Sequence, residues 1–408
     1  MAKKKNNSNK RKNKSKNQGK KSQQLGTKVD RQTGSLFFRR LPQEIRVEIY
    51  SHVFSSTRLA FGERTTGRIS TIDIKPARNS LALLRVCRRM KHEIGNSWLS
   101  QVLFFFEDPG TLLDKLTPLP RNILSRLRRV TFAGDTLMVS FPEDDVYYRP
   151  VSVLKLLPGL RLDVLTVLGG HGSDVNYDAL SGLIADGSGW KELRYISCSS
   201  AMLGFSLFDI MGDRSRYHRK PQPLYWQCMM EDRDGLALKP SVTIYRATES
   251  GRYGSILDPS KRVQYEQKPD QVQAPVFQPG VFREDPELMT DGEKEKEILV
   301  VVKRGFGVDF EKKGGPPHFD GDIMEDMPVK TWAYVRANHV DFPDSDDDDY
   351  GDDYDDSNSD DDDDDEYLRG SRGCPSSSAK KEFVGQADVY KDVDEYAWNP
   401  LHFNPRGF

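Results

Sequence analysis

FFRRLPQEIRVEIYSHVF, residues 37–54, opens the part of the chain that can fold. Pro42 suits the first turn of a helix, because its missing N–H would have no partner there. Ile45, Ile49 and Val53 then recur every four residues, which predicts that they share one side of that helix. Such a helix either seals the end of its own domain or presents its apolar side chains to another protein.

A basic leader precedes this helix. Residues 1–34 are mostly Lys, Asn, Ser, Gln and Gly with almost nothing to bury, so we expect them to be disordered. They contain a cationic cluster of the kind that nuclear importins bind, which also suits contacts with nucleic-acid phosphates. The cluster consists of Lys10, Arg11, Lys12, Lys14 and Lys16. The alternative is a tail that only keeps the chain in solution. No aromatic residue precedes Phe37, which disfavours stacking on single-stranded bases.

Two further patterns complete an N-terminal region that we take as residues 35–106. Residues 58–75 look extended and predict a hairpin that turns near residues 65–67. Ser80 then suits the cap of a second helix, and residues 102–106 predict a strand directly after it. The buried stripe of this second helix would consist of Leu83, Cys87, Met90, Ile94 and Trp98.

Helix-like and strand-like segments alternate over residues 107–248. Alternation of this kind favours a parallel sheet with helices packed against it. The strand centres are too unevenly spaced for a true leucine-rich repeat, which has a tighter period. The expected fold class is therefore α/β or α+β, with an irregular layer that resembles a degenerate leucine-rich repeat. We expect helices near residues 112–116, 151–157, 177–184 and 224–230, and strands near residues 127–132, 164–168, 193–197 and 242–245.

Composition divides the rest of the chain into three segments. Residues 249–342 are polar and dotted with proline, so we expect a linker with two returning strands, at Ile298–Val302 and Trp332–Val335. Residues 343–382 are acidic and then Ser-rich, and we expect them to be disordered. Residues 383–408 form an aromatic C-terminal segment that suits docking on the domain or a short linear motif.

The acidic segment carries a dense negative charge. Residues 344–366 contain sixteen Asp or Glu and no Lys or Arg, although the whole chain of 408 residues has a net charge of only -2. Repulsion prevents such a run from folding by itself. It is either a solvated spacer, a screen that folds back on the basic leader, or a binding site for basic proteins such as histones or ribosomal proteins.

The two helical motifs near the amino end resemble those of an F-box. The run Leu84–Met90 is similar to the last F-box helix, which typically reads L-x-x-V-C-R-x-W. The stretch 37–106 also resembles the F-box-like leader of a group of filamentous-fungal proteins. In that group LP-x-E-I-R-x-x-I-Y is followed by an extended insert, then L-L-x-x-C-R-x-x-x-x-E, then an aromatic strand. The residues similar to the first F-box helix are Leu41, Pro42, Glu44, Ile45 and Ile49.

This chain departs from the F-box pattern in two places. Residues 55–79 separate the two helical motifs, whereas an ordinary F-box is more compact. Met90 stands where the family usually has tryptophan. Both departures bear on whether the segment still docks on a ubiquitin-ligase adaptor.

The resemblance implies a non-enzymatic subunit that recognises substrates for an SCF-type ubiquitin ligase. Its N-terminal helices would bind the Skp-type adaptor of a cullin–RING ligase, and its α/β layer would hold a protein substrate that the sequence does not identify. The partner-binding residues implied are Leu41, Pro42, Glu44, Ile45, Ile49, Val86, Cys87 and Arg88. The alternative function is a nuclear scaffold whose basic and acidic tails make weak contacts with nucleic acid or basic proteins.

The sequence contains no constellation that predicts catalysis, a cofactor or a metal ion. Gly169-Gly170-His171-Gly172 follows a predicted strand but lacks the spacing of a phosphate-binding loop, so a flexible loop is expected. The seven His and four Cys match no zinc-ligand spacing. The longest apolar runs are far too short to cross a bilayer. We therefore expect a protein of the nucleus or cytoplasm that is neither an enzyme nor a membrane protein.

Overall fold

The computed structural model of the 408-residue chain describes about three fifths of it. The described residues are 32, 34–66, 70–77, 79–140, 145–170, 172–204, 222–252, 254–266, 288, 290–310, 323 and 331–339.

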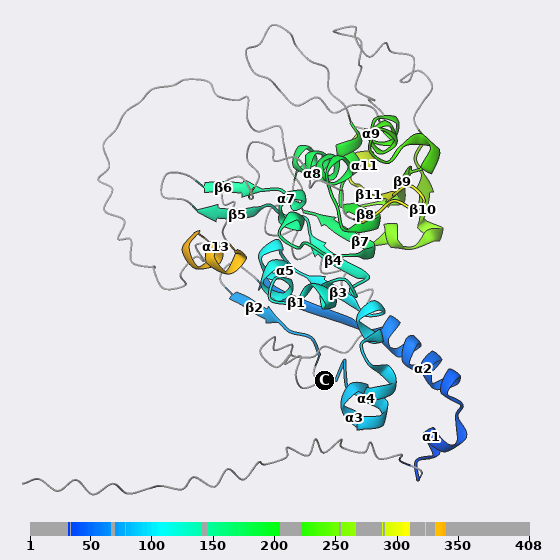
Figure 1. Cartoon of the computed structure of the whole chain (residues 1–408). Helices are drawn as coiled ribbons and strands as arrows, with labels where there is room; N and C mark the ends of the chain where they lie inside the picture. Colours follow the sequence, from blue (N-terminus) through cyan, green and yellow to red (C-terminus); the bar gives the residue numbers. More distant parts are fainter. Residues whose placement is uncertain are drawn as a thin grey trace, which may run out of the picture.

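A nine-stranded mixed sheet forms the centre of the fold, with the order β10-β9-β11-β8-β7-β4-β3-β1-β2 (Figure 1). The α/β class expected from the alternation is therefore confirmed. The strands, in chain order, are β1 Arg58–Thr66, β2 Ser70–Ile74, β3 Leu103–Phe106, β4 Arg129–Ala133, β7 Leu162–Gly169, β8 Trp190–Ser197, β9 Ser241–Ser250, β10 Arg262–Gln264 and β11 Lys296–Lys303. A separate hairpin pairs β5 (Leu137–Ser140) with β6 (Asp145–Tyr148).

Five consecutive strands of this sheet, β1, β3, β4, β7 and β8, are parallel and lie side by side in chain order. Each strand is therefore added on the same side of the one before it. Crossovers between parallel strands are almost always right-handed. With one hand and one direction of growth, every connecting helix must lie on the same face of the sheet.

The helices on that face come from the crossovers. Their apolar side chains share one core with the inward side chains of the strands, such as Phe132 on β4, Leu165 on β7 and Tyr195 on β8. The crossover helices are α5 Pro109–Leu116, α6 Arg121–Leu124, α7 Pro150–Lys155, α8 Ser173–Ala185 and α9 Leu224–Asp234. All four helices expected between residues 107 and 248 are found, and α6 is an additional short one.

The strands beyond β8 are antiparallel, which departs from the purely parallel sheet that the alternation favours. β11 pairs with β8 on one side and with β9 on the other, although β9 precedes β11 in the chain. The return expected for Ile298–Val302 is thus an insertion into the middle of the sheet. The chain reaches β11 through the short 3-10 helices η4 (Ser255–Leu257) and η5 (Pro259–Lys261), β10 and α11 (Asp291–Lys294).

Two expectations for individual elements are wrong. The segment Trp332–Val335 is not a strand but part of helix α13 (Trp332–His339), whose Trp332 donates through Nε1 to Asp114 on α5 at 2.8 Å. The second N-terminal helix is broken into α3 (Leu83–Val86) and α4 (Arg88–Ile94), and the 3-10 helix η1 (Ser97–Ser100) follows. Cys87 is extended at the break, and its Sγ accepts from the Met90 N–H at 3.3 Å, so it caps α4.

The hairpin expected over residues 58–75 is present as the antiparallel pair β1–β2. It lies within the sheet, because β1 also pairs in parallel with β3. Two helices precede it, α1 (Leu36–Arg40) and α2 (Gln43–Ser55). Figure 1 shows α1 and α2 extending away from the sheet, with α3 and α4 close by.

Gly169 is the last residue of β7 and lies beside a buried polar cluster. The expectation of a flexible loop over residues 169–172 is therefore wrong at Gly169. Tyr195 donates to Asn176 Oδ1 at 2.9 Å, and the Asn176 amide contacts Ser197 Oγ at 3.3 Å. A Cβ at Gly169 would lie 2.6 Å from Asn176 Oδ1 and 2.8 Å from the Tyr195 hydroxyl. Burial also raises the pKa of Tyr195, so the phenol stays protonated as the donor.

We expect Gly169→Ala to lower the free energy of unfolding by about 1–3 kcal/mol, the usual cost of overpacking a core. Urea unfolding followed by circular dichroism measures it. Gly292→Ala is the matched control, because no atom lies within 4 Å of its Cβ position. That variant should be as stable as the parent or slightly more stable. Equal midpoints for both variants would show that the end of β7 relaxes freely.

Candidate protein-docking site

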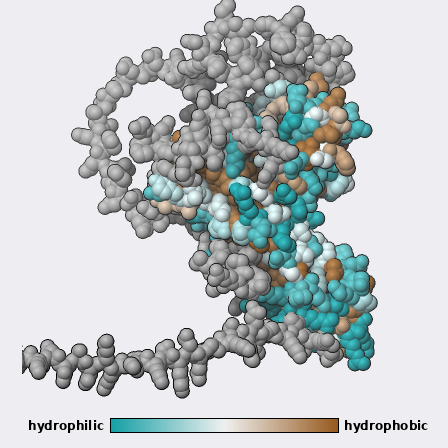
Figure 2. Space-filling view, in the orientation of Figure 1, coloured by the Kyte–Doolittle hydropathy of each residue, from teal (hydrophilic) through white to brown (hydrophobic). Residues whose placement is uncertain are grey.

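Helix α2 presents apolar side chains on its outer side. Ile45, Ile49 and Val53 are 42%, 36% and 39% exposed, and Val47 beside them is 46% exposed. We call Ile45, Ile49 and Val53 the α2 ridge. Spacing by four residues aligns them along one side of the helix. Figure 2 shows small apolar areas among hydrophilic ones in the region where Figure 1 draws α2.

The inner side of α2 carries an arginine and two aromatic residues. Arg46, Tyr50 and Phe54 repeat at the same spacing of four, one residue out of step with the ridge, and all three are buried. An amphipathic helix normally turns its aliphatic residues inward and its charges outward. In α2, three aliphatic side chains face outward and a charged one faces inward, so the ridge is not needed to close the core.

A buried ion pair holds α2 against α4. Arg46 Nε and Nη2 donate to the two carboxylate oxygens of Glu93 at 2.9 and 2.8 Å, a bidentate geometry. Arg46 Nη1 also donates to the Leu41 carbonyl at 2.6 Å, at the start of α2. Charge-assisted bidentate pairs are among the stronger protein hydrogen bonds and fix the relative orientation of their partners.

Further donors and a ring complete this cluster. The Tyr50 hydroxyl donates to Glu93 Oε2 at 3.2 Å, and Arg89 Nε donates to Glu93 Oε1 at 3.1 Å. The guanidinium carbons of Arg46 and Arg89 lie 5.3 and 4.4 Å from the centre of the Phe38 ring. We call Arg46, Tyr50, Arg89 and Glu93 the Glu93 cluster.

The cluster shifts the pKa values of its members. Burial by itself raises the pKa of Glu93, but the hydrogen bonds from Arg46 and Arg89 outweigh it, so this pKa lies below its usual range. The hydrogen bond to Glu93 raises the pKa of Arg46. Burial, together with the Glu93 charge, raises the pKa of Tyr50 to about 12. At neutral pH Glu93 is therefore a carboxylate, Arg46 a guanidinium cation and Tyr50 a protonated phenol.

The structure separates the first set of expected partner-binding residues by exposure. Ile45 and Ile49 lie on the α2 ridge. Pro42 and Glu44 are exposed at the start of α2, and Pro42 is the capping residue rather than part of the first turn. Leu41 is half-buried, and its carbonyl accepts from Arg46. Four of these five residues are thus open to a partner.

The second set lies where α3 meets α4. Val86 is 63% exposed at the end of α3, and Arg88 is exposed at the start of α4. Cys87 is half-buried and caps α4, so its contribution is to local structure. α4 joins the two sets in space, because its Glu93 binds Arg46 of α2.

Sequence reasoning missed the residues that hold these helices together. Arg46 and Tyr50 are the R and final Y of the LP-x-E-I-R-x-x-I-Y pattern, and Glu93 is the last letter of the second pattern. The two motifs contain these residues, but a single sequence does not show that Arg46 and Glu93, which are 47 positions apart, contact each other. Val53, the third member of the ridge, was visible only as part of the repeat.

The remaining expectations concern the tails, metal ions and membrane spans. Lys10, Arg11, Lys12, Lys14 and Lys16 lie outside the described residues, as do residues 344–366 and 383–408. Within the described ranges no group of three or more His, Cys, Asp or Glu is arranged to hold a metal ion. No helix in those ranges is both long and apolar enough to span a membrane.

Comparisons with protein-family models, curated proteins and solved structures find no match to this chain.

Removing the cation from the Glu93 cluster should destabilise the fold. We expect Arg46→Met to lower the free energy of unfolding by about 2–4 kcal/mol, because Glu93 would be left buried with fewer partners. The double variant Arg46→Met/Glu93→Leu should recover most of this loss, since neither charge then remains unpaired. Urea unfolding of the full chain measures both, and equal losses for the single and double variants would contradict the ion pair.

Acid should weaken the same contact. The pKa of Glu93 is lower in the folded state, so the unfolded chain takes up this proton at a higher pH. The stability that Glu93 contributes is therefore complete above its ordinary pKa and is lost as the pH falls through the lower, folded value. We expect the urea midpoint of the parent to fall more from pH 6 to pH 3 than that of Arg46→Met/Glu93→Leu, so the gap between the two midpoints should change with pH. A constant gap would argue against an ionised Glu93.

Proposed function

We propose that this protein is an F-box-like substrate-recognition subunit, in which α2 docks on the Skp-type adaptor of a cullin–RING ubiquitin ligase. The function needs no catalytic group in this chain, because the ligase supplies the chemistry. The observation that carries the proposal is the α2 ridge, whose three aliphatic side chains are each more than a third exposed. The opposite side of α2 is bound to α4 through Arg46 and Glu93.

Exposed aliphatic residues in line on a helix support a helix-in-groove contact. Apolar anchors at i, i+4 and i+8 are a recurring means by which an amphipathic helix binds a partner. Binding energy in such contacts comes from a few buried anchors surrounded by a polar rim. The α2 ridge offers the anchors, and Glu44, Glu48 and His52 are the exposed polar residues beside it.

The Glu93 cluster supports the proposal by fixing the ridge before a partner arrives. A rigid helix loses less conformational freedom on binding than one that must first be ordered. The insert at residues 55–79, which departs from a compact F-box, does not separate the helices in space. Its strands β1 and β2 join the sheet, while α2 stays bound to α4 through Arg46 and Glu93.

The double variant Ile45→Asp/Ile49→Asp tests adaptor docking. We expect it to lose the adaptor and cullin in pull-downs of the full chain, because two charges would have to be buried in an apolar groove. Its thermal unfolding should stay close to that of the parent, since both side chains are already exposed.

Leu236→Asp is the matched control for this pull-down. Leu236 is 70% exposed on the short 3-10 helix η3 (Leu236–Leu238), which is not part of α2. We expect this variant to retain the adaptor. Recovery of the same partners by all three proteins, or no adaptor with any of them, would end the proposal.

The charge asymmetry of the sequence favours a second candidate, a nuclear scaffold that binds through its basic and acidic tails. Salt separates the two candidates. Contacts made by charged tails weaken steeply between low and physiological ionic strength, whereas docking through aliphatic anchors does not. Partners that are retained by Ile45→Asp/Ile49→Asp and lost with salt would belong to the tails.

A further inference from the structure

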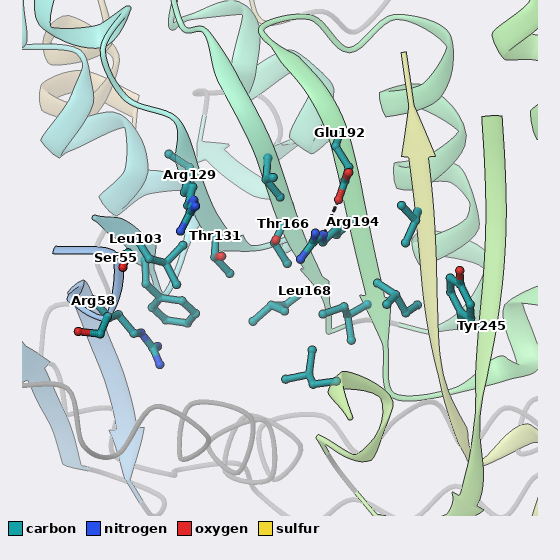
Figure 3. Close-up of a pocket in the computed structure, with 18 of the residues that line it drawn as sticks. Ser55, Arg58, Leu103, Arg129, Thr131, Thr166, Leu168, Glu192, Arg194 and Tyr245 are labelled. Atoms are coloured by element: carbon teal, nitrogen blue, oxygen red, sulfur yellow. Dashed lines mark hydrogen bonds and ion pairs between the residues drawn. The ribbon is translucent and has the colours of Figure 1, made fainter. Parts of the chain in front are cut away.

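The sheet face opposite the crossover helices forms a groove of about 780 Å³. Side chains from β3, β4, β7, β8, β9 and β11 line it, and the end of α2 borders it at Ser55. Figure 3 shows Arg129, Thr131, Thr166 and Arg194 projecting from neighbouring strands into this space. The groove is a consequence of strand order, because all described crossover helices pack on the other face.

Strand register arranges the side chains on this face of the sheet in three rows. A charged row runs along the amino ends of the parallel strands: Arg58, Leu103, Arg129, Val164, Glu192 and Lys303. A middle row follows, two residues along each parallel strand: Ala60, Phe105, Thr131, Thr166, Arg194 and Val301. An apolar row lies beyond it: Ala133, Leu168, Ile196, Leu299 and Tyr245.

Positive charge dominates the groove. Its lining contains five cationic side chains, Arg58, Arg129, Arg194, Arg262 and Lys303, and a single carboxylate, Glu192. That carboxylate accepts from Arg194 at 2.7 Å and lies 4.0 Å from Lys303. Arg129 is exposed and forms no ion pair with any described residue. The groove therefore carries positive charge that its own carboxylate does not neutralise.

The apolar row distinguishes this surface from a plain anion site. Ile196 and Leu299 are only 3% and 4% exposed, because they pack with Ile256 of η4. Leu168, Leu257 and Val301 also line the groove and are half-buried, so they are the apolar side chains that a ligand can meet. Exposed apolar surface rimmed by polar residues is typical of binding sites. A ligand that fits the groove needs negative charge on one side and apolar groups on the other.

An extended peptide meets this requirement better than a nucleic acid. Successive side chains of an extended chain point to opposite sides, so alternating acidic and apolar residues would face the charged and apolar rows. Base stacking needs free aromatic faces. The Phe105 ring already carries Arg58 on one face at 3.8 Å, and Tyr245 carries Arg262 at 4.7 Å.

From this arrangement we infer that the groove binds an extended segment of a partner protein in which acidic and aliphatic residues alternate. Six strands spaced by about 4.8 Å span about 24 Å, enough for about seven extended residues. The inference goes beyond adaptor docking and does not require it, because the groove lies on the sheet and the ridge on α2.

The chain's own acidic run fits less well than such a partner. Residues 344–366 carry sixteen acids, but they contain no Leu, Ile, Val, Met or Phe to meet the apolar row. Charge alone would attract the run to the groove, so the experiment includes an arm that tests for it.

Fluorescence anisotropy of the full chain tests the inference with a labelled synthetic peptide of about eight residues that alternates Asp with Leu. We expect Arg129→Glu/Arg194→Glu to weaken binding by about tenfold or more, since two groove charges are reversed. Arg129→Glu alone, which leaves the Glu192 pair intact, should weaken it less. The matched control is Arg121→Glu/Arg126→Glu, which reverses two exposed charges that do not line the groove and should leave binding unchanged.

Five results would overturn the inference. Two concern the peptide: equal binding of an Asn/Leu peptide, and equal affinity of the groove and control variants. A third is an RNA oligonucleotide that binds more tightly than the peptide with the same dependence on Arg129 and Arg194.

The last two results use a full chain whose acids at 344–366 are changed to Asn and Gln. Binding only after that change, lost again with Arg129→Glu/Arg194→Glu, would assign the groove to the chain's own acidic run. No binding in either form would exclude the site.

Discussion

The rule that crossovers between parallel strands are right-handed constrains this fold more than any single contact. Five strands are added in one direction, so the crossover helices have only one face of the sheet available to them. In a sheet whose order reverses partway, helices would cover both faces. Here one face forms the main core, whereas η4 packs on part of the other face and the rest of that face forms the groove.

The same strands therefore carry two different kinds of residue in strict alternation. On β4, Val130 and Phe132 enter the core, whereas Arg129 and Thr131 face the groove. A one-residue change of register would exchange these two sets, at the cost of burying arginine in the apolar core. Arg129 thus helps to define the register while remaining exposed to a ligand.

Helix α2 also divides its residues between a buried and an exposed side, but here a charged residue lies inward and aliphatic residues lie outward. Its inward stripe contains Arg46, and the cost of burying that charge is offset by the bidentate carboxylate of Glu93. Because the inner side is satisfied by charge and aromatic packing, the aliphatic residues Ile45, Ile49 and Val53 are left outside. An orientation fixed by directional hydrogen bonds, with an apolar side facing outward, suits a helix that docks on a partner.

The sequence by itself determined the local elements and the class of fold. Period-two runs such as Val164–Leu168 and period-four runs such as Ile45–Val53 follow the repeat of a strand and of a helix, so they can be recognised without a structure. The motif letters also predicted α2 as a docking element. The break at Cys87 and the helix at Trp332 were not recognised, because short apolar runs are compatible with either type of element.

The tertiary structure alone decided which faces are free. The sequence shows that Arg46 and Ile45 lie on different sides of a helix, but not which side faces the protein, since that depends on Glu93 across 47 positions. It likewise predicts strands but not their order, and that order leaves one face of the sheet free of crossover helices. Long-range pairings such as β11 between β8 and β9 arise from contacts that no local pattern records. Both candidate binding surfaces of this protein depend on such contacts.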